Sequence, residues 1–322
     1  LGPVLSPFYL LADVGRAFTR LPVTLIYHGW HMADDIVWEP LDDEEGDAAD
    51  RAEIAAQRIH AATGSDNSSR AGRVAQRIVY ALGMPFRIVT VPLIDAGGKS
   101  AWDVMVGRTR TALQTSHALD LPDEAVYNVG YTPPDGALGK LISGLLAMTS
   151  NHVQYSYTLI GHSLGALLAN EVVRYYPELP CRDIVYMGAA ASLRDTGMSL
   201  IPYLQRHPQC TFYNLCLHEH ADQTEYMWLM ILPRGSILEW IDSFLADPIT
   251  MNDLTIGKWK NAIRTLPSLT EQMRCQVVIK AFGVDDPVFN LLGGRMPEKH
   301  TDFSNPALRF WERQFWELPH QH

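Results

Sequence analysis

The chain has 322 residues, 47% of them hydrophobic and 19% charged, and a formal net charge of −10. This composition can build a large folded core, so it excludes a globally disordered chain, and the length suits one α/β domain with an insertion. The acidic balance argues against a nucleic-acid-binding protein and against docking on an anionic membrane surface, because both need a basic patch.

Short apolar runs alternate along the chain with longer stretches of helical periodicity. The runs predict strands at Val23–His28, Arg87–Val91, Tyr157–Ile160, Asp183–Met187, Thr211–Leu217 and Gln276–Phe282. Amphipathic stretches predict helices at Leu138–Thr149, Leu164–Tyr176 and Ala307–Leu318. The alternation predicts an α/β fold, with a mostly parallel, doubly wound sheet, helices on both faces and a ligand site at the carboxyl ends of the strands.

Two stretches stand apart from this alternation. The run from Asp34 to Glu53 holds ten acidic residues against one arginine and is typical of a solvated loop leading into a helix. Residues 223–266 separate the last two predicted strands and are unusually apolar, so we expect a helical cap or lid within a single domain spanning residues 1–322. Four large side chains of this insertion either pack the cap onto the domain or form a wall for an acyl chain: Trp228, Met230, Trp240 and Phe244.

The four cysteines each lie in or beside a predicted strand, at Cys181, Cys210, Cys216 and Cys275. They lack the spacing of a zinc site, so we expect buried free thiols and no metal. Free thiols favour a reducing compartment such as the cytoplasm. The first residues show no signal-peptide pattern, and the longest apolar run, Tyr226–Leu232, is too short to span a bilayer, so we expect no membrane insertion.

The most informative motif is G-x-S-x-G, formed by Gly161-His162-Ser163-Leu164-Gly165. A predicted strand runs directly into it and a predicted helix runs directly out. This setting predicts a nucleophile elbow, a turn so sharp that the serine backbone is strained and its hydroxyl is lifted to the helix N-terminus. Glycine is expected at both ends of the motif because a side chain at Gly161 or Gly165 would collide with the neighbouring strand and helix.

With this motif the chain resembles the α/β-hydrolase superfamily, specifically its lipase, esterase and thioesterase members, and the resemblance implies Ser163 as the nucleophile. Upstream, the sequence Val23-Thr24-Leu25-Ile26-Tyr27-His28-Gly29-Trp30 resembles the family's strand ending in His-Gly, whose following loop lends an N–H to the oxyanion hole. The resemblance therefore implies the backbone N–H groups of Trp30 and Leu164 as the oxyanion-hole donors.

A serine nucleophile needs a general base, and in this fold the base follows the acid along the chain. His300 is the predicted base, because it lies on the loop before the predicted last helix, which Ser304 or Asn305 would cap. The remaining downstream histidines, His320 and His322, lie in the last three residues of the chain.

The acid is expected after the second strand that follows the nucleophile. There Asp222 is the first choice and Glu219 the near alternative. Asp285 and Asp286, which follow the next predicted strand, resemble the family's acid loop as well and are a further alternative.

These residues predict a serine hydrolase that cleaves a carboxylic ester, preferably an acyl or other hydrophobic ester, with no metal or organic cofactor. Thioesterases and acyltransferases use the same triad, so both are alternatives. A different alternative is a non-catalytic α/β-hydrolase-like binding module. The expected partner is thus a small-molecule ester or acyl substrate.

Overall fold

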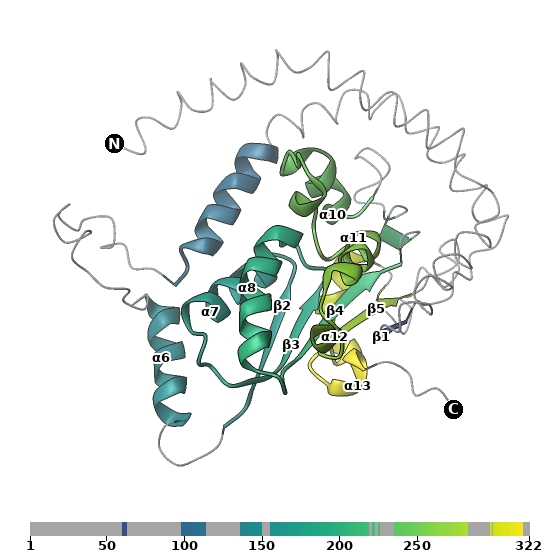
Figure 1. Cartoon of the computed structure of the whole chain (residues 1–322). Coiled ribbons are helices and arrows are strands. Elements are labelled where there is room, and N and C mark those ends of the chain that lie inside the picture. Colours follow the sequence, from purple (N-terminus) through teal and green to yellow (C-terminus); the bar gives the residue numbers. More distant parts are fainter. Residues whose placement is uncertain are drawn as a thin grey trace, which may run out of the picture.

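The computed structural model describes residues 60–62, 98–113, 136–149, 155–218, 221–222, 225, 235–282, 297 and 299–317 (Figure 1). At its centre is a parallel sheet with the strand order β1-β5-β4-β3-β2. The strands are His60–Ala62 (β1), Tyr157–His162 (β2), Cys181–Met187 (β3), Thr211–Leu217 (β4) and Val277–Phe282 (β5). Helices alternate with the strands from β2 onward, so the predicted α/β class is confirmed.

The last four predicted strands are confirmed, with boundaries that differ by at most two residues. The predicted strands Val23–His28 and Arg87–Val91, and the acidic run from Asp34, lie outside the described residues. The short β1, which pairs His60 with Val278 of β5, was not predicted. Strands β2 to β5 follow one another across the sheet in chain order, so the double winding stays a prediction.

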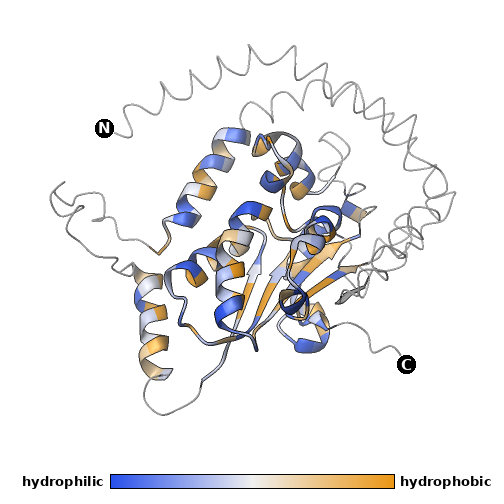
Figure 2. Cartoon of the chain, in the orientation of Figure 1, coloured by the Kyte–Doolittle hydropathy of each residue, from blue (hydrophilic) through white to orange (hydrophobic). Residues whose placement is uncertain are grey.

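Both faces of the central strands β3 and β4 are buried, which explains why these strands are largely apolar (Figure 2). On one face, Ile184 and Tyr186 of β3 belong to a core shared with three helices: α6 (Ala137–Thr149), α7 (Gly165–Tyr175) and α8 (Leu193–Arg206). Figure 1 shows α7 and α8 lying over this face. On the other face, Val185 and Met187 belong to a second core that the C-terminal segment completes.

The start of each helix reflects its local sequence. Ser192 caps α8 by accepting a hydrogen bond from the Asp195 N–H at 3.1 Å. By contrast, α7 follows Leu164 without any side-chain cap. Helices α6 and α7 confirm the predicted helices over this part of the chain. Among the described helices, none is both long enough and apolar enough to cross a membrane.

The predicted C-terminal helix Ala307–Leu318 is wrong. The chain instead forms a 3-10 turn (η6, Pro306–Leu308), reverses at Arg309 with φ of +49°, and makes only a four-residue helix, α13 (Arg313–Trp316). Tertiary contacts explain the break, because Phe315 and Trp316 pack into the second core. The predicted cap is present, since the side chain of Asn305 accepts from the Ala307 N–H at 3.0 Å.

Three of the four cysteines are buried free thiols, as expected, at Cys181, Cys210 and Cys216. Cys275 is free as well, but it is exposed, because it lies in the turn before β5 rather than within the sheet.

Between β4 and β5 the chain forms a series of short helices. They are α10 (Ile237–Trp240), the π-helix η2 (Ile241–Leu245), η3 (Met251–Asp253), α11 (Trp259–Thr265), η4 (Leu266–Ser268) and α12 (Glu271–Arg274). Leu238, Trp240 and Ile241 pack in one buried cluster with Trp102, which belongs to a helix over residues 98–110. Trp240 is therefore a packing residue here, while Trp228, Met230 and the side chain of Phe244 lie outside the described part.

The later part of this segment docks backbone to backbone on the end of β3. The Gly257 N–H donates to the Ala189 carbonyl at 3.0 Å, and the Ile256 N–H donates to the Ala191 carbonyl at 2.9 Å. A Cβ at Gly257 would lie 2.2 Å from the Ala189 nitrogen, so only glycine allows this approach.

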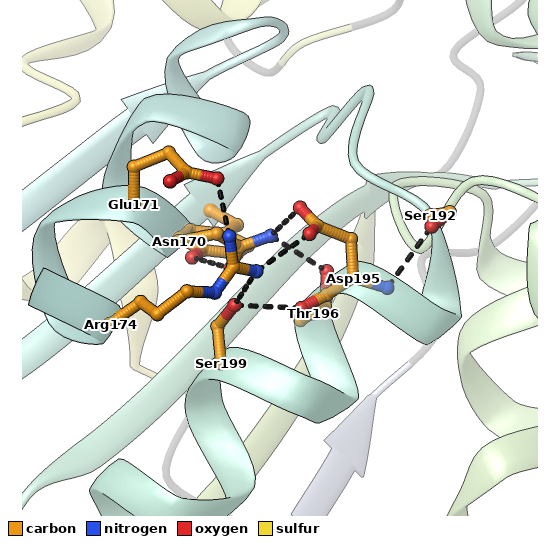
Figure 3. A network of polar contacts seen from close by, with 8 residues as sticks. Asn170, Glu171, Arg174, Ser192, Asp195, Thr196 and Ser199 are labelled. Atoms are coloured by element: carbon orange, nitrogen blue, oxygen red, sulfur yellow. Dashed lines mark hydrogen bonds and ion pairs between the residues drawn. The ribbon is translucent and has the colours of Figure 1, made fainter. Parts of the chain in front are cut away.

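A closed polar network fastens α7 to α8 (Figure 3). Asn170, with no exposed surface, accepts from the Tyr186 hydroxyl at 2.6 Å and donates to Asp195 at 2.8 Å. Arg174 donates to Asp195 at 2.7 Å and to Ser199 at 2.6 Å, and it also pairs with Glu171. The network fixes α7, the helix that follows the motif serine, relative to α8 and β3.

Candidate active site

The turn between β2 and α7 has the predicted geometry. Ser163 adopts φ of +54°, in the left-handed region that residues with a Cβ rarely enter. The strand ends at His162 and the helix begins at Gly165, so the strained residue lies in the two-residue turn between them. A strained non-glycine residue at such a turn is typical of a functional site, where surrounding contacts hold the conformation.

Those surrounding contacts are hydrogen bonds to the Ser163 backbone. Its N–H donates to the Met187 carbonyl at 3.0 Å, and its carbonyl accepts from Ala166 and from Ala190, each at 3.1 Å. Met187 and Ala190 lie at the carboxyl end of β3, so the serine is attached to the neighbouring strand as well as to its own helix.

The two motif glycines differ in what they do. A Cβ at Gly161 would lie 2.7 Å from the Gly165 carbonyl oxygen and 2.8 Å from the Ala166 nitrogen, so the tight turn requires glycine there. A Cβ at Gly165 would meet no atom beyond its own helical turn within 4 Å. The expectation of a collision is thus confirmed for Gly161 and wrong for Gly165. The backbone of Gly165 is instead what a side chain at Gly161 would meet.

The predicted oxyanion-hole donors are only half described. Leu164 lies at the N-terminus of α7, and within the described residues its backbone N–H makes no hydrogen bond. An uncapped helix start of this kind presents free N–H groups and the positive end of the helix dipole, which favour a negative charge. Trp30, the other predicted donor, lies outside the described residues.

The predicted base, His300, is 5% exposed and begins the 3-10 turn η5 (His300–Ser304). Its backbone is held on both sides by side chains from other elements. The His300 N–H donates to Glu225 Oε2 at 2.9 Å, and the His300 carbonyl accepts from His162 Nε2 at 3.0 Å. Because a carbonyl only accepts, His162 carries its proton on Nε2.

The imidazole ring of His300 lies against the carboxyl ends of β2 and β3. Its centroid is 5.0 Å from that of the His162 ring, and a Cβ at Gly188 would lie 2.9 Å from its Nδ1. Among the described residues neither ring nitrogen has a hydrogen-bond partner, although both are buried. Burial, followed by the influence of His162, lowers the pKa of His300 to about 3, so the ring is neutral at physiological pH.

Ser163 and His300 therefore both lie at the carboxyl ends of β2 and β3, without a hydrogen bond between them. Ser163 binds the Met187 carbonyl, and the ring of His300 lies against Gly188, the next residue. Since both ring nitrogens are unpaired, there is no hydrogen bond between the serine hydroxyl and the imidazole in this structure.

Asp222, the first-choice acid, is buried at the end of β4 but contacts other groups. Its carboxylate accepts a hydrogen bond from the Ser236 hydroxyl, and it lies within the electrostatic influence of Lys258. Burial raises the pKa of Asp222, and Lys258 partly offsets this effect. In the described part of the chain, no bond joins Asp222 to His300, and Glu219, Asp285 and Asp286 lie outside that part.

Sequence reasoning gave no role to two residues that contact His300, namely His162 and Glu225. His162 stands inside the motif, next to the serine, but only the fold shows that it reaches a residue 138 positions away. Glu225 follows Asp222 by three residues, so a search of the whole segment after β4 for carboxylates would have included it.

Comparison with known proteins adds no assignment: no family model, curated protein or solved structure matches the chain. Within the described residues, no group of three or more His, Cys, Asp or Glu side chains is arranged to hold a metal ion.

Proposed function

We propose that this chain is a serine hydrolase of the α/β-hydrolase fold, which cleaves a carboxylic ester through an acyl-enzyme on Ser163. The observation that carries the proposal is a strained serine and a buried histidine at the carboxyl ends of neighbouring strands, where the described residues leave both ring nitrogens of the histidine unpaired. Each buried polar atom without a partner costs roughly 1–3 kcal/mol, so such atoms are rare outside sites where a ligand or reacting group completes them.

The chemistry that these positions support follows from their hydrogen-bonding capacity. A neutral imidazole accepts the Ser163 proton while the serine oxygen attacks the ester carbonyl. The resulting oxyanion needs N–H donors, which the free N–H of Leu164 and the predicted N–H of Trp30 would supply. The leaving alcohol then takes the proton from His300, and a water molecule releases the acid by the same route in reverse.

The third member of the triad stays a prediction between Asp222 and the pair Asp285 and Asp286. A carboxylate that reached the unpaired imidazole would raise the pKa of His300 from about 3 toward the range of an efficient base. The preference for a hydrophobic acyl group rests on the apolar sequence of residues 223–266, because Trp102, Trp240 and Leu238 are already packed against one another in a buried cluster.

The experiment is turnover of p-nitrophenyl esters of increasing acyl length, with acyl-CoA in parallel, by the parent chain and by Ser163→Ala. We expect ester hydrolysis that Ser163→Ala reduces by about 10⁴-fold or more, and labelling of Ser163 by a fluorophosphonate probe. Full turnover by Ser163→Ala would contradict the proposal. Acyl-CoA cleavage or transfer, in place of ester hydrolysis, would favour a thioesterase or acyltransferase, and absence of labelling would favour a binding module.

A further inference from the structure

We infer that Glu225 is a positioning residue for His300, acting on the backbone of the base rather than on its ring. The inference rests on the proposed function, because it needs His300 to be the base. Glu225 is 6% exposed, and its Oε2 atom lies 2.9 Å from the His300 nitrogen, although 75 positions separate the two residues in the chain.

Glu225 joins three segments of the chain: the end of β4, the start of α10 and the turn that carries His300. Its own N–H donates to the Ala221 carbonyl at 3.1 Å, just after β4, and its carbonyl accepts from the Gly235 N–H at 3.0 Å, just before α10. Its carboxylate holds the first residue of η5. A shift of Glu225 would therefore move the loop that carries His300 relative to the ends of β2 and β3.

The contact gives the loop a defined position because the His300 N–H has no local acceptor. At the start of a helical turn the first N–H groups lack partners within the turn. The neighbouring Lys299 N–H is satisfied locally, by Asp302 at 2.9 Å, whereas within the described part of the chain the His300 N–H is satisfied only by Glu225. An oxygen acceptor at this point therefore fixes where the first residue of η5 lies.

The geometry also separates the role of Glu225 from that of a triad acid. Its bond goes to the backbone, and both nitrogens of the imidazole are left free for Ser163 and for a proton-orienting carboxylate. His162 completes the arrangement on the other side by donating to the His300 carbonyl at 3.0 Å. The base is thus fixed through its main chain while its side chain is left open to react.

An oxygen acceptor is what this role requires, so two substitutions of similar shape test it. Glu225→Gln keeps a carbonyl oxygen for the His300 N–H, whereas Glu225→Met fills the same space without an oxygen. We expect Glu225→Met to lower kcat for ester hydrolysis by about 10- to 100-fold with KM nearly unchanged, and Glu225→Gln to stay within about threefold of the parent. The rate of fluorophosphonate labelling at Ser163 should fall in parallel with kcat.

The matched control is Glu171→Met, which removes a carboxylate of similar burial that pairs with Arg174 and, among the described residues, contacts neither Ser163 nor His300. Thermal unfolding of all variants separates loss of the fold from loss of alignment. If Glu225→Met does not fold, Glu225→Asp, with a shorter reach, should show the same loss of kcat relative to Glu225→Gln.

Parent-like kcat in Glu225→Met, with Ser163→Ala inactive, would overturn the positioning role and leave the proposed function standing. Equal losses in Glu225→Met and Glu225→Gln would also overturn it, because charge rather than an acceptor would then matter. Activity retained by Ser163→Ala would instead remove the proposed function itself.

Discussion

Two buried polar regions, one between α7 and α8 and one around His300, differ in how completely their atoms are paired. Between α7 and α8, Asn170 uses its oxygen and its nitrogen, and the charges of Arg174 and Asp195 meet. Beside the N-terminus of α7, the backbone of His300 is paired but its two ring nitrogens are not. A closed network of this kind holds elements together, whereas an open one leaves bonding capacity for a reacting partner.

The largest expected effect is at the open region. His300→Leu should lower kcat for ester hydrolysis by about 10³- to 10⁴-fold, because the serine would lose its base. Stability should be unchanged or slightly higher, since the substitution removes two buried nitrogens that have no partners. Ester-hydrolysis kinetics measure kcat, and urea unfolding of the same sample measures stability. A large loss of stability would mean that the imidazole ring is part of a closed network.

The opposite pattern is expected at the closed network. Asn170→Ala would leave the Tyr186 hydroxyl and Asp195 without their shared partner, so it should reduce the free energy of unfolding by about 2–4 kcal/mol. Activity per folded molecule should stay within a few-fold of the parent. Denaturant unfolding measures the loss of stability, and active-site titration with a fluorophosphonate gives the activity per folded molecule. A selective loss of kcat would contradict the difference expected between this network and the region around His300.

The two motif glycines give a smaller, paired test. Gly161→Ala places a Cβ within 2.8 Å of α7 backbone atoms, and we expect it to cost about 1–3 kcal/mol and to misplace Ser163. Gly165→Ala meets open space and should be neutral or stabilising by up to about 1 kcal/mol, because alanine favours the helix. Thermal unfolding with ester turnover distinguishes them; equal losses would show that the helix start tolerates no side chain.

The effect that is smallest at neutral pH is a change in stability with acid. The pKa of His300 is about 3 in the folded chain and 6.5 for a free histidine side chain, so below pH 6.5 the unfolded chain binds a proton that the folded chain excludes. Acid therefore destabilises the parent, and the contribution of His300 is fully recovered only above pH 6.5. Relative to His300→Leu, the parent should lose up to about 1.4 kcal/mol per pH unit below that value. Parallel stability curves for the two proteins, measured by urea unfolding, would contradict the lowered pKa.

The local sequence pattern was enough to predict the strands β2 to β5 and the elbow, because a buried parallel strand and a glycine-bounded turn each depend on residues that are adjacent in the sequence. It failed where distant contacts decide. The chain after Asn305 has a helical pattern, but Arg309 turns it so that Trp316 reaches the second core. Glu225 and His162 could not be linked to His300 from spacing, since the bonds cross 75 and 138 positions.

The contact of Gly257 with Ala189 has a consequence for how this chain can diversify. Gly257 binds the chain directly after β3, and the Met187 carbonyl at the end of β3 accepts the Ser163 N–H, so the later part of the β4–β5 segment shares a strand end with the serine. A substitution at Gly257 should therefore disturb Ser163 as well, whereas Ile249 of the same segment is 92% exposed and can vary without moving that strand end. The variation that this segment tolerates is thus set residue by residue, by its contacts with the sheet.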